Sequence, residues 1–283
     1  MKNKILSILC AAVIAVSGIM TISCDVSAEW VKTKLGYTYK DEKTGKKLTG
    51  WQTIDGGRYY FSKKGVVLTG WQTLSGKKYY FDPAKHGKAV TGWTKNGDVY
   101  RYFNKKGVMC TTRALQNGKS YSFTSDGVFV GVVNNKTGIV PINELSNLKS
   151  LKKSCTDEEF KQAYNNALKI VEPLVGMSVD EQLLEIAYAL RMKVENGEVT
   201  YSTSEKHYSD PYGYFVSGVG SCAGCARATG LCLNMLGISY EHVNENQWSH
   251  QWCRVKMGTE YYICDAYGLY VGKEPGIRKH PYL

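Results

Sequence analysis

The tripeptide Thr-Gly-Trp recurs three times in the first half of this chain, beginning at Thr49, Thr69 and Thr91. Behind each copy come a glycine-bearing turn and a group of aromatic residues, and weaker copies flank the array at 37–39 and 121–123. A repeat of roughly 20 residues is typical of a solenoid whose units stack on one another. We therefore expect residues 29–132 to form an array of stacked units.

Each unit has the pattern of a β-hairpin. Residues 51–54 and 58–62 alternate as short strands, and the Asp55-Gly56-Gly57 sequence between them is typical of a hairpin turn. A lone hairpin cannot bury its aromatic face, whereas stacked copies bury it against each other and leave shallow aromatic slots between neighbours. Such slots suit the flat faces of sugars or quaternary ammonium groups.

With these motifs the array resembles the Gly-Trp cell wall-binding repeats of Gram-positive surface proteins, which include choline-binding, glucan-binding and clostridial-toxin repeats. The position before the Tyr-Tyr pair, often Trp in the choline cages of that group, is Arg58 in one copy and Lys78 in the next. A cation there repels a quaternary ammonium, so we expect a wall polysaccharide or an anionic wall polymer as ligand, not choline. A purely structural spacer is the alternative. The ligand-binding residues implied by the resemblance are Trp51, Tyr59, Tyr60, Phe61, Trp71, Tyr79, Tyr80, Phe81, Trp93 and Tyr102.

The first 28 residues have the features of a secretory signal peptide. Lys2 and Lys4 precede an apolar run that ends near Met20, and small residues at 26–28 offer a cleavage site. The apolar run is short for a membrane-spanning helix, which needs about 20 residues. A membrane anchor and a lipoprotein site at Cys24 are the alternatives. We expect a secreted protein of the cell wall or cell surface, with no transmembrane segment in the mature chain.

Charge and cysteine content fit an exported protein. The formal net charge is +11, and removing the predicted signal peptide leaves +10. Positive charge attracts anionic wall polymers, or it serves solubility alone; no compact Lys/Arg block points to nucleic acid. Seven of the nine cysteines lie beyond residue 28. An odd number leaves at least one of them without an intramolecular disulfide partner.

The second half of the chain has the pattern of an α+β domain. Capping-box spacing at Thr156/Glu159 and at Ser178/Glu181 predicts two helices, each with one largely apolar face. A third helix is expected to begin at Cys222 and to end before Gly237. Strands are predicted over 238–243, 250–255 and 261–267.

Three residues of this half have the chemical character of a nucleophilic enzyme: Cys222, His250 and Asp265. A thiol, an imidazole and a carboxylate together suffice for covalent acyl transfer. Cys222 falls in the first turn of the predicted helix, where backbone N–H groups and the helix dipole favour a thiolate and can stabilise an oxyanion. If the last two strands pair about the turn at 257–259, His250 and Asp265 come nearly opposite, and the carboxylate orients the imidazole.

The sequences Gly-Ser-Cys-Ala-Gly-Cys-Ala around Cys222, His-Gln-Trp from His250 and Tyr-Ile-Cys-Asp ending at Asp265 resemble the three motifs of the transglutaminase-like superfamily. The resemblance covers roughly residues 156–272. It implies a papain-like core of helices packed on an antiparallel sheet, with Cys222 as nucleophile, His250 as general base and acid, and Asp265 as orienting carboxylate. Cys225 stands where the family usually has Tyr, and Ala266 where Pro commonly follows the Asp.

Several alternatives remain open for the cysteines. Cys225, Ala228, Cys232 and Met235 form one apolar stripe of the helix, which favours Cys225 as a core residue. A disulfide, a thioredoxin-type Cys-x-x-Cys dithiol and a zinc site are the rival interpretations. No second ligand pair with zinc spacing and no calcium loop is visible, so we expect no metal and no cofactor.

We therefore expect a secreted, cell wall-associated thiol enzyme that acts on amide or peptide bonds of a protein or peptide substrate, by acyl transfer or by hydrolysis. A wall-binding protein with an inert transglutaminase-like domain is the alternative, with the dithiol exchanger behind it. The expected segments are a signal peptide (1–28), the repeat array (29–132), a linker (133–155) and the catalytic domain (156–283).

Overall fold

The computed structural model describes residues 29–41 and 44–274. The predicted signal peptide lies outside the described residues. The described residues divide into two compact units, one of residues 29–41 and 44–52 together with 60–68, and one of residues 53–59 together with 69–274. Within the described ranges no helix has the length and apolar character needed to cross a membrane.

The repeats form β-hairpins, as the sequence predicts. In the first unit β1 (Glu29–Thr33) pairs antiparallel with β2 (Gly36–Lys40), and the Trp30 ring lies 5.9 Å from that of Phe61 in a stacked arrangement. The next hairpin consists of β3 (Gly50–Ile54) and β4 (Gly57–Phe61). Its two central turn residues, Asp55 and Gly56, have φ angles of 47° and 70°. Two consecutive positive φ angles define the turn that matches the twist of paired strands.

Three further hairpins belong to the second unit. Their strands are β5 (Gly70–Leu74) and β6 (Lys77–Asp82) with the short β7 (Lys88–Ala89), β8 (Gly92–Asn96) and β9 (Val99–Phe103), and β10 (Ala114–Gln116) and β11 (Lys119–Phe123) with β12 (Phe129–Val133). The Trp71 ring lies 6.0 Å from Phe103, and the Trp93 ring lies 5.8 Å from Phe123. Each tryptophan thus packs on a buried phenylalanine of the following hairpin, which is how stacked hairpins bury an aromatic face.

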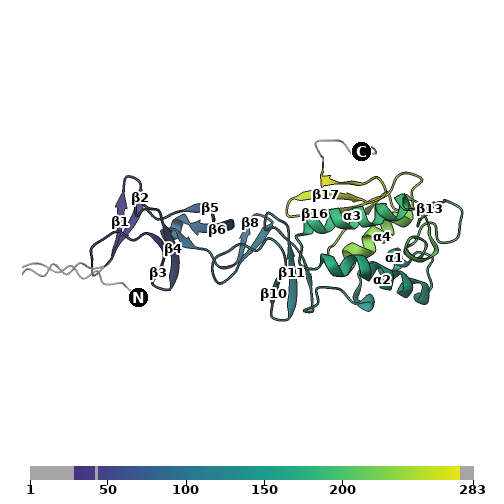
Figure 1. Ribbon diagram of the computed structural model, residues 1–283, viewed down its shortest axis with the longest axis horizontal. Helices are drawn as coiled ribbons and strands as arrows, with labels where there is room; N and C mark the ends of the chain where they lie inside the picture. The colour runs from purple at the N-terminus through teal and green to yellow at the C-terminus, as the bar shows by residue number, and fades with distance from the viewer. Residues whose placement is uncertain (1–28, 42–43, 275–283) are drawn as a thin grey trace, which may run out of the picture. The chain divides into compact units, whose positions relative to one another are not determined.

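The C-terminal part is a mixture of helices and an antiparallel sheet, which confirms the α+β class. The helices are α1 (Leu148–Lys152), α2 (Asp157–Val171), α3 (Val179–Glu195) and α4 (Cys222–Met235), and the sheet consists of β15 (Glu241–Val243), β16 (Trp252–Met257), β17 (Glu260–Asp265) and β18 (Tyr270–Lys273) in that order. Every residue of α4 after Cys222 is buried. This helix packs against α1, α2 and α3 and against β16, and the helices lie on one side of the β16–β17 pair (Figure 1).

The predicted helix ends are present. Thr156 Oγ1 accepts a hydrogen bond from the Glu159 N–H group at 3.2 Å, and Glu159 Oε2 accepts one from the Thr156 N–H group at 2.8 Å. Ser178 and Glu181 form a second capping box. Gly237 follows α4 with a φ of 71°, a conformation that glycine adopts at low cost. Loss of one such N-cap typically costs about 1 kcal/mol of stability.

The segment 133–155 is not a linker, and here the sequence prediction was wrong. Leu145, Leu151 and Cys155 are buried in the same hydrophobic core as α2, α3 and α4. The Val140 N–H group donates a hydrogen bond to the Met235 carbonyl oxygen at 2.7 Å. The segment lacks a periodic pattern because its contacts are made one residue at a time by a 3₁₀ turn, η2 (Ile142–Glu144), and by the single turn of α1.

Candidate functional site

Cys222 is the first residue of α4, as the sequence predicts, and it is the residue of that helix that is not buried. Ser221 before it is extended, and its N–H group is bonded to the Tyr208 carbonyl oxygen at 2.8 Å. This bond fixes the entry to the helix. The backbone of Gln251 and that of Ala223 both lower the pKa of the Cys222 thiol. A half-exposed thiol held by backbone N–H groups at a helix start is suited to bear negative charge.

His250 and Asp265 meet as the predicted strand pairing requires. The register of β16 on β17 pairs Cys253 with Cys264, which brings the residues just before β16 close to the end of β17. His250 Nε2 lies 2.7 Å from Asp265 Oδ2, and the side chains are 7% and 1% exposed. Asp265 Oδ1 accepts a second hydrogen bond from the Gly268 N–H group at 3.0 Å. The carboxylate is therefore fixed at both oxygens and holds the ring in one orientation.

The imidazole also contacts the thiol. The imidazole favours the ionised form of the Cys222 thiol, and the thiol in turn favours the protonated form of the His250 imidazole. The His250 ring stacks on Trp252 with a centroid distance of 5.8 Å. Trp252 is buried, so it packs against the His250 ring and does not line the cleft. The structure thus brings together all three residues of the predicted triad.

Ionisation of the pair favours a nucleophile. Burial opposes ionisation of the Cys222 thiol, but hydrogen bonds from His250 and from the Gln251 backbone outweigh it and lower the pKa of this thiol below its ordinary value. Burial lowers the pKa of the His250 imidazole, but the interactions with Asp265 and Cys222 outweigh burial and raise this pKa to about 9. A depressed thiol pKa beside an elevated imidazole pKa describes a thiolate–imidazolium pair.

The triad opens into a cleft of about 530 Å³. Four aromatic side chains line it, Tyr201, Tyr208, Trp248 and Tyr267. Trp248 is 94% exposed, so its ring is available to a ligand. Flat apolar walls beside a nucleophile suit an extended substrate segment whose carbonyl group enters the site.

The other cysteines do not compete with Cys222. Cys225 is 1% exposed and packs in the core with Ala228, Cys232 and Met235, so the interpretation as a core residue is confirmed. Burial raises the pKa of the Cys225 thiol to about 12. The seven cysteines of the described residues are all free thiols. A buried thiol with an elevated pKa cannot act as the exposed partner that a dithiol exchanger needs.

The aromatic residues predicted to bind the wall ligand fall into two groups. Tyr59, Phe61, Tyr79 and Phe81 are buried, so their rings hold neighbouring hairpins together and face no ligand; the prediction is corrected for these four. The rings that keep exposed surface are those of Trp51, Tyr60, Trp71, Tyr80, Trp93 and Tyr102, with Trp71 and Trp93 at 52% and 41%. Alternation along each strand explains the division, because successive side chains point to opposite faces.

One slot between repeats is well defined. It has a volume of about 430 Å³ and is lined by Trp71, Lys78, Arg101 and Asp126 among others. The Arg101 guanidinium lies over the Trp71 ring at 5.5 Å from its centroid, and Lys78 Nζ lies 3.0 Å from Asp126 Oδ1. Arg101 thus occupies the position over the Trp71 ring, and Lys78 lies at the side of the slot.

A second group of reactive side chains was not predicted from the sequence. Cys155, His207 and Asp210 are buried, and their donor atoms lie within 4.8 Å of one another. His207 and Asp210 are three residues apart in one loop, but Cys155 lies far away along the chain, so no spacing pattern connects it to them. The sequence predicts no metal in this chain.

Comparison with known proteins identifies the repeats. The sequence profile of a family described as choline-binding repeat matches residues 48–85 and 68–114. This match supports the prediction of cell wall-binding repeats, while the family description runs against the prediction that choline is not the ligand. The match does not extend into the C-terminal domain. No curated protein matches the chain.

Solved structures of repeat proteins are similar to part of the chain. Choline binding protein F from Streptococcus pneumoniae, solved with a peptidoglycan analogue, is 32% identical over 42% of this chain and 37% of that chain, with a TM-score of 0.34. The modular Cpl-1 endolysin, also with a peptidoglycan analogue, is 27% identical over 34% of this chain and 28% of that chain, with a TM-score of 0.28. This chain therefore spans well under half the length of either.

Proposed function

We propose that this chain is a cell wall-bound thiol enzyme of the transglutaminase-like type, which forms a thioester on Cys222. The observation that supports the proposal most directly is the Cys222–His250–Asp265 geometry, with a 2.7 Å bond between the last two and a thiol pKa below its ordinary value. Motif order and spacing in the sequence support the family assignment, and the repeats supply attachment to the wall.

The residues carry out a complete reaction. The Cys222 thiolate attacks the carbonyl carbon of an amide, and backbone N–H groups at the start of α4 stabilise the oxyanion. The tetrahedral intermediate collapses as the His250 imidazolium donates its proton to the departing amine, which leaves a thioester on Cys222 and a neutral imidazole. His250 then accepts a proton from water or from an incoming amine as that group attacks the thioester, and the thiolate leaves. Water yields hydrolysis and an amine yields acyl transfer.

A direct test traps the acyl-enzyme. The full chain is incubated with cell wall fragments and, separately, with glutamine-containing peptides, quenched in acid and examined by intact-protein and peptide mass spectrometry. We expect a mass increase equal to the acyl group on the peptide that contains Cys222. The matched control is Cys222→Ala, which lacks the sulfur and cannot form the thioester. An adduct on another residue, or no adduct from either substrate in a protein whose Cys222 alkylates rapidly, contradicts the proposal.

A protein that attaches to the wall but catalyses no reaction is the second candidate. The family match over residues 48–114 supports wall attachment in this candidate. Cys222→Ala separates the two, because it should bind purified Gram-positive walls as well as the unaltered chain does while it loses all acyl transfer. If the unaltered chain also turns over no wall fragment or peptide under any pH, the second candidate is the correct one.

The ligand of the repeats follows from the slot at Trp71. A quaternary ammonium group binds an aromatic face through the attraction of its charge to the ring, and Arg101 already places a cation over that face. The slot therefore favours hydroxyl and anionic groups of a wall polymer, which Lys78 and Arg101 can bind. The description of the matched family favours choline, and elution with free choline distinguishes the two ligands.

A further inference from the structure

The cleft beside Cys222 carries positive charge that its own lining does not balance. Of the described residues that line it, Lys153, Arg227 and His250 can carry a positive charge, and none is an aspartate or a glutamate. Lys153 and Arg227 meet at one side chain, because both donate hydrogen bonds to Asn246 Oδ1, at 2.6 and 3.4 Å. A cleft lined by charge of one sign attracts ligands of the opposite sign.

The charge of Arg227 is already used inside the protein. Its side chain is 2% exposed, and its Nη2 lies 3.0 Å from Oε1 of Glu245, a residue that does not line the cleft. The Nε and Nη1 groups of Arg227 donate hydrogen bonds to the carbonyl oxygens of Ser150 and Ser209 at 3.0 and 3.1 Å. Arg227 therefore joins α1 to the loop that contains Ser209, and its ion pair with Glu245 leaves it little charge for a ligand.

Lys153 keeps its charge available to a ligand. Its partner Asn246 is a neutral amide, whereas the Nζ group of the preceding Lys152 is paired with the Asp157 carboxylate. An ammonium group bound to one amide oxygen retains its full charge and two further N–H donors. The positive charge also acts on His242, whose pKa is lowered to about 4 by burial and by Arg227, with a smaller contribution from Lys153.

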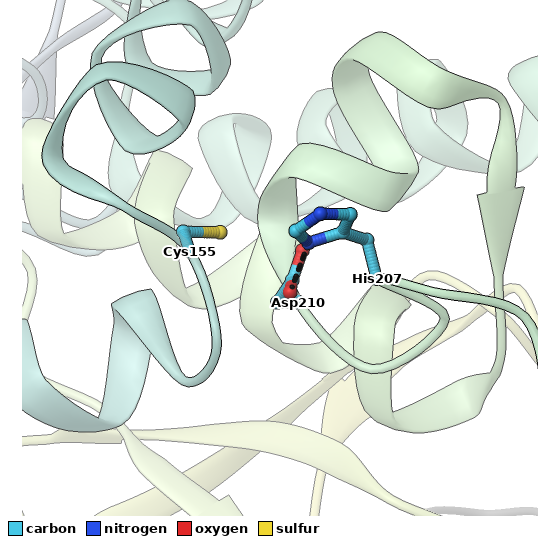
Figure 2. Close-up of side chains that lie close together, drawn as sticks. All are labelled: Cys155, His207 and Asp210. Carbon is cyan, nitrogen blue, oxygen red and sulfur yellow. Dashed lines mark hydrogen bonds and ion pairs between the residues drawn. The ribbon is translucent and has the colours of Figure 1, made fainter.

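The backbone holds Lys153 at a fixed place beside the cleft. Lys153 has a φ of 49° and a ψ of −99°, a conformation that residues other than glycine rarely adopt. The Ser154 hydroxyl that follows donates a hydrogen bond to Asp210 Oδ2 at 2.6 Å. The sulfur of the next residue, Cys155, points toward the His207 ring and the Asp210 carboxylate (Figure 2). A strained conformation persists only where its surroundings impose it, and such positions concentrate at binding sites.

We propose that the substrate attacked by Cys222 carries a free carboxylate, and that Lys153 binds this carboxylate. The proposal rests on the proposed function for the reaction and adds the class of substrate. Arg227, which shares Asn246 with Lys153, lies five positions after Cys222 on α4, or about 7.5 Å along the helix axis. One extended residue spans about 3.5 Å, so the bound carboxylate lies within a few residues of the reacting amide. An acidic peptide therefore fits this cleft better than a neutral or a basic one.

The test measures alkylation of Cys222 in the full chain by short iodoacetyl peptides that differ only in charge. Iodoacetyl-diglycine carries a terminal carboxylate, and its amide is the neutral match. The amide of iodoacetyl-glycyl-glutamate carries a side-chain carboxylate, and the corresponding glutamine peptide is its neutral match. The dependence of the rate on label concentration separates the apparent dissociation constant of the label from the maximal rate.

We expect a carboxylate label to have a dissociation constant ~3- to 5-fold lower than that of its neutral match, as for an exposed ion pair, with the same maximal rate. The difference should shrink at high ionic strength. The pair of labels that shows it identifies the source of the carboxylate, a chain terminus or an acidic side chain.

Variants of two adjacent lysines assign the effect to one side chain. Lys153→Met should raise the dissociation constant of the carboxylate label to that of its neutral match, and Lys153→Arg should restore the difference. Lys152→Met is the matched control, because it removes the same charge from a side chain that pairs with Asp157 and does not line the cleft. Equal constants for both labels in the unaltered chain overturn the inference, and so does a difference that survives Lys153→Met.

Failure of this inference and failure of the proposed function give different results. A carboxylate preference that depends on Lys153, in a chain that forms no acyl-enzyme, overturns the proposed function and leaves Lys153 as the carboxylate-binding residue. An acyl-enzyme on Cys222 in a chain without the preference overturns the substrate class alone.

Discussion

Replacing Asp265 with asparagine isolates the contribution of the buried carboxylate to the triad. The side chain keeps its size, so Oδ1 can still accept the hydrogen bond from the Gly268 N–H group. The new amide group then presents N–H to His250 Nε2, which has to accept a hydrogen bond that it donated before. The ring changes tautomer, its Nδ1 carries the proton, and it can no longer take a proton from the thiol.

The size of the effect follows from the His250 pKa. A shift from the ordinary value of 6.5 to about 9 corresponds to roughly 3 kcal/mol, since each pKa unit is worth about 1.36 kcal/mol. Asp265 and Cys222 share this stabilisation of the imidazolium, and His250 is well enough buried for the interaction to act with little solvent screening. Loss of Asp265 alone should therefore cost about 2 kcal/mol, or roughly 30-fold in the population of the thiolate–imidazolium pair.

Alkylation by iodoacetamide measures this population. The pair exists above the depressed pKa of Cys222 and below the His250 pKa of about 9, so the unaltered chain should react rapidly well below the ordinary thiol pKa. In Asp265→Asn the rate at neutral pH should fall on the order of 10- to 100-fold, and the upper limit of the ion-pair range should move toward lower pH. Label is located by peptide mass spectrometry.

Cys110 serves as the internal reference in the same samples, because burial raises its pKa and it lies in the repeats. The remaining described cysteines are buried, so we expect them to react slowly. If Cys222 titrates like Cys110 in the unaltered chain, or if Asp265→Asn leaves its rate unchanged while the fold is intact, the carboxylate does not act through His250 and this reasoning fails.

Three further outcomes are expected. Gly268→Ala should reduce single-turnover acylation at least about tenfold, because the added Cβ would clash with Asp265 Oδ2 and displace the carboxylate; an unchanged rate would mean that the carboxylate position is unimportant. Cys225→Ala should lower the free energy of unfolding by about 1–3 kcal/mol in urea denaturation and leave alkylation of Cys222 nearly unchanged, whereas abolished reactivity in a folded protein would favour the dithiol mechanism. Trp71→Ala, made in the Cys222→Ala background, should weaken retention on purified walls, and millimolar choline should not elute the parent; elution by choline would contradict the ligand argument.

The local elements and the order of the catalytic residues could be predicted because each depends on a short stretch of sequence. The hairpin turn at Asp55-Gly56, the capping box at Thr156 and the glycine after α4 are fixed by backbone conformation and by side chains a few residues away. The pairing of His250 with Asp265 followed from one strand register about a short turn. Contacts of this kind leave a periodic or positional signal in the chain.

What the sequence alone determined is therefore the array of hairpins, the class of the C-terminal domain and the residue types of the candidate active site. Only the tertiary structure decided which aromatic rings are buried between repeats, that residues 133–155 belong to the core, and that Cys155 meets His207 and Asp210. The physical reason is that these features depend on packing between segments far apart in the chain. Such contacts are set by the burial of many side chains at once, and no spacing within one segment records them.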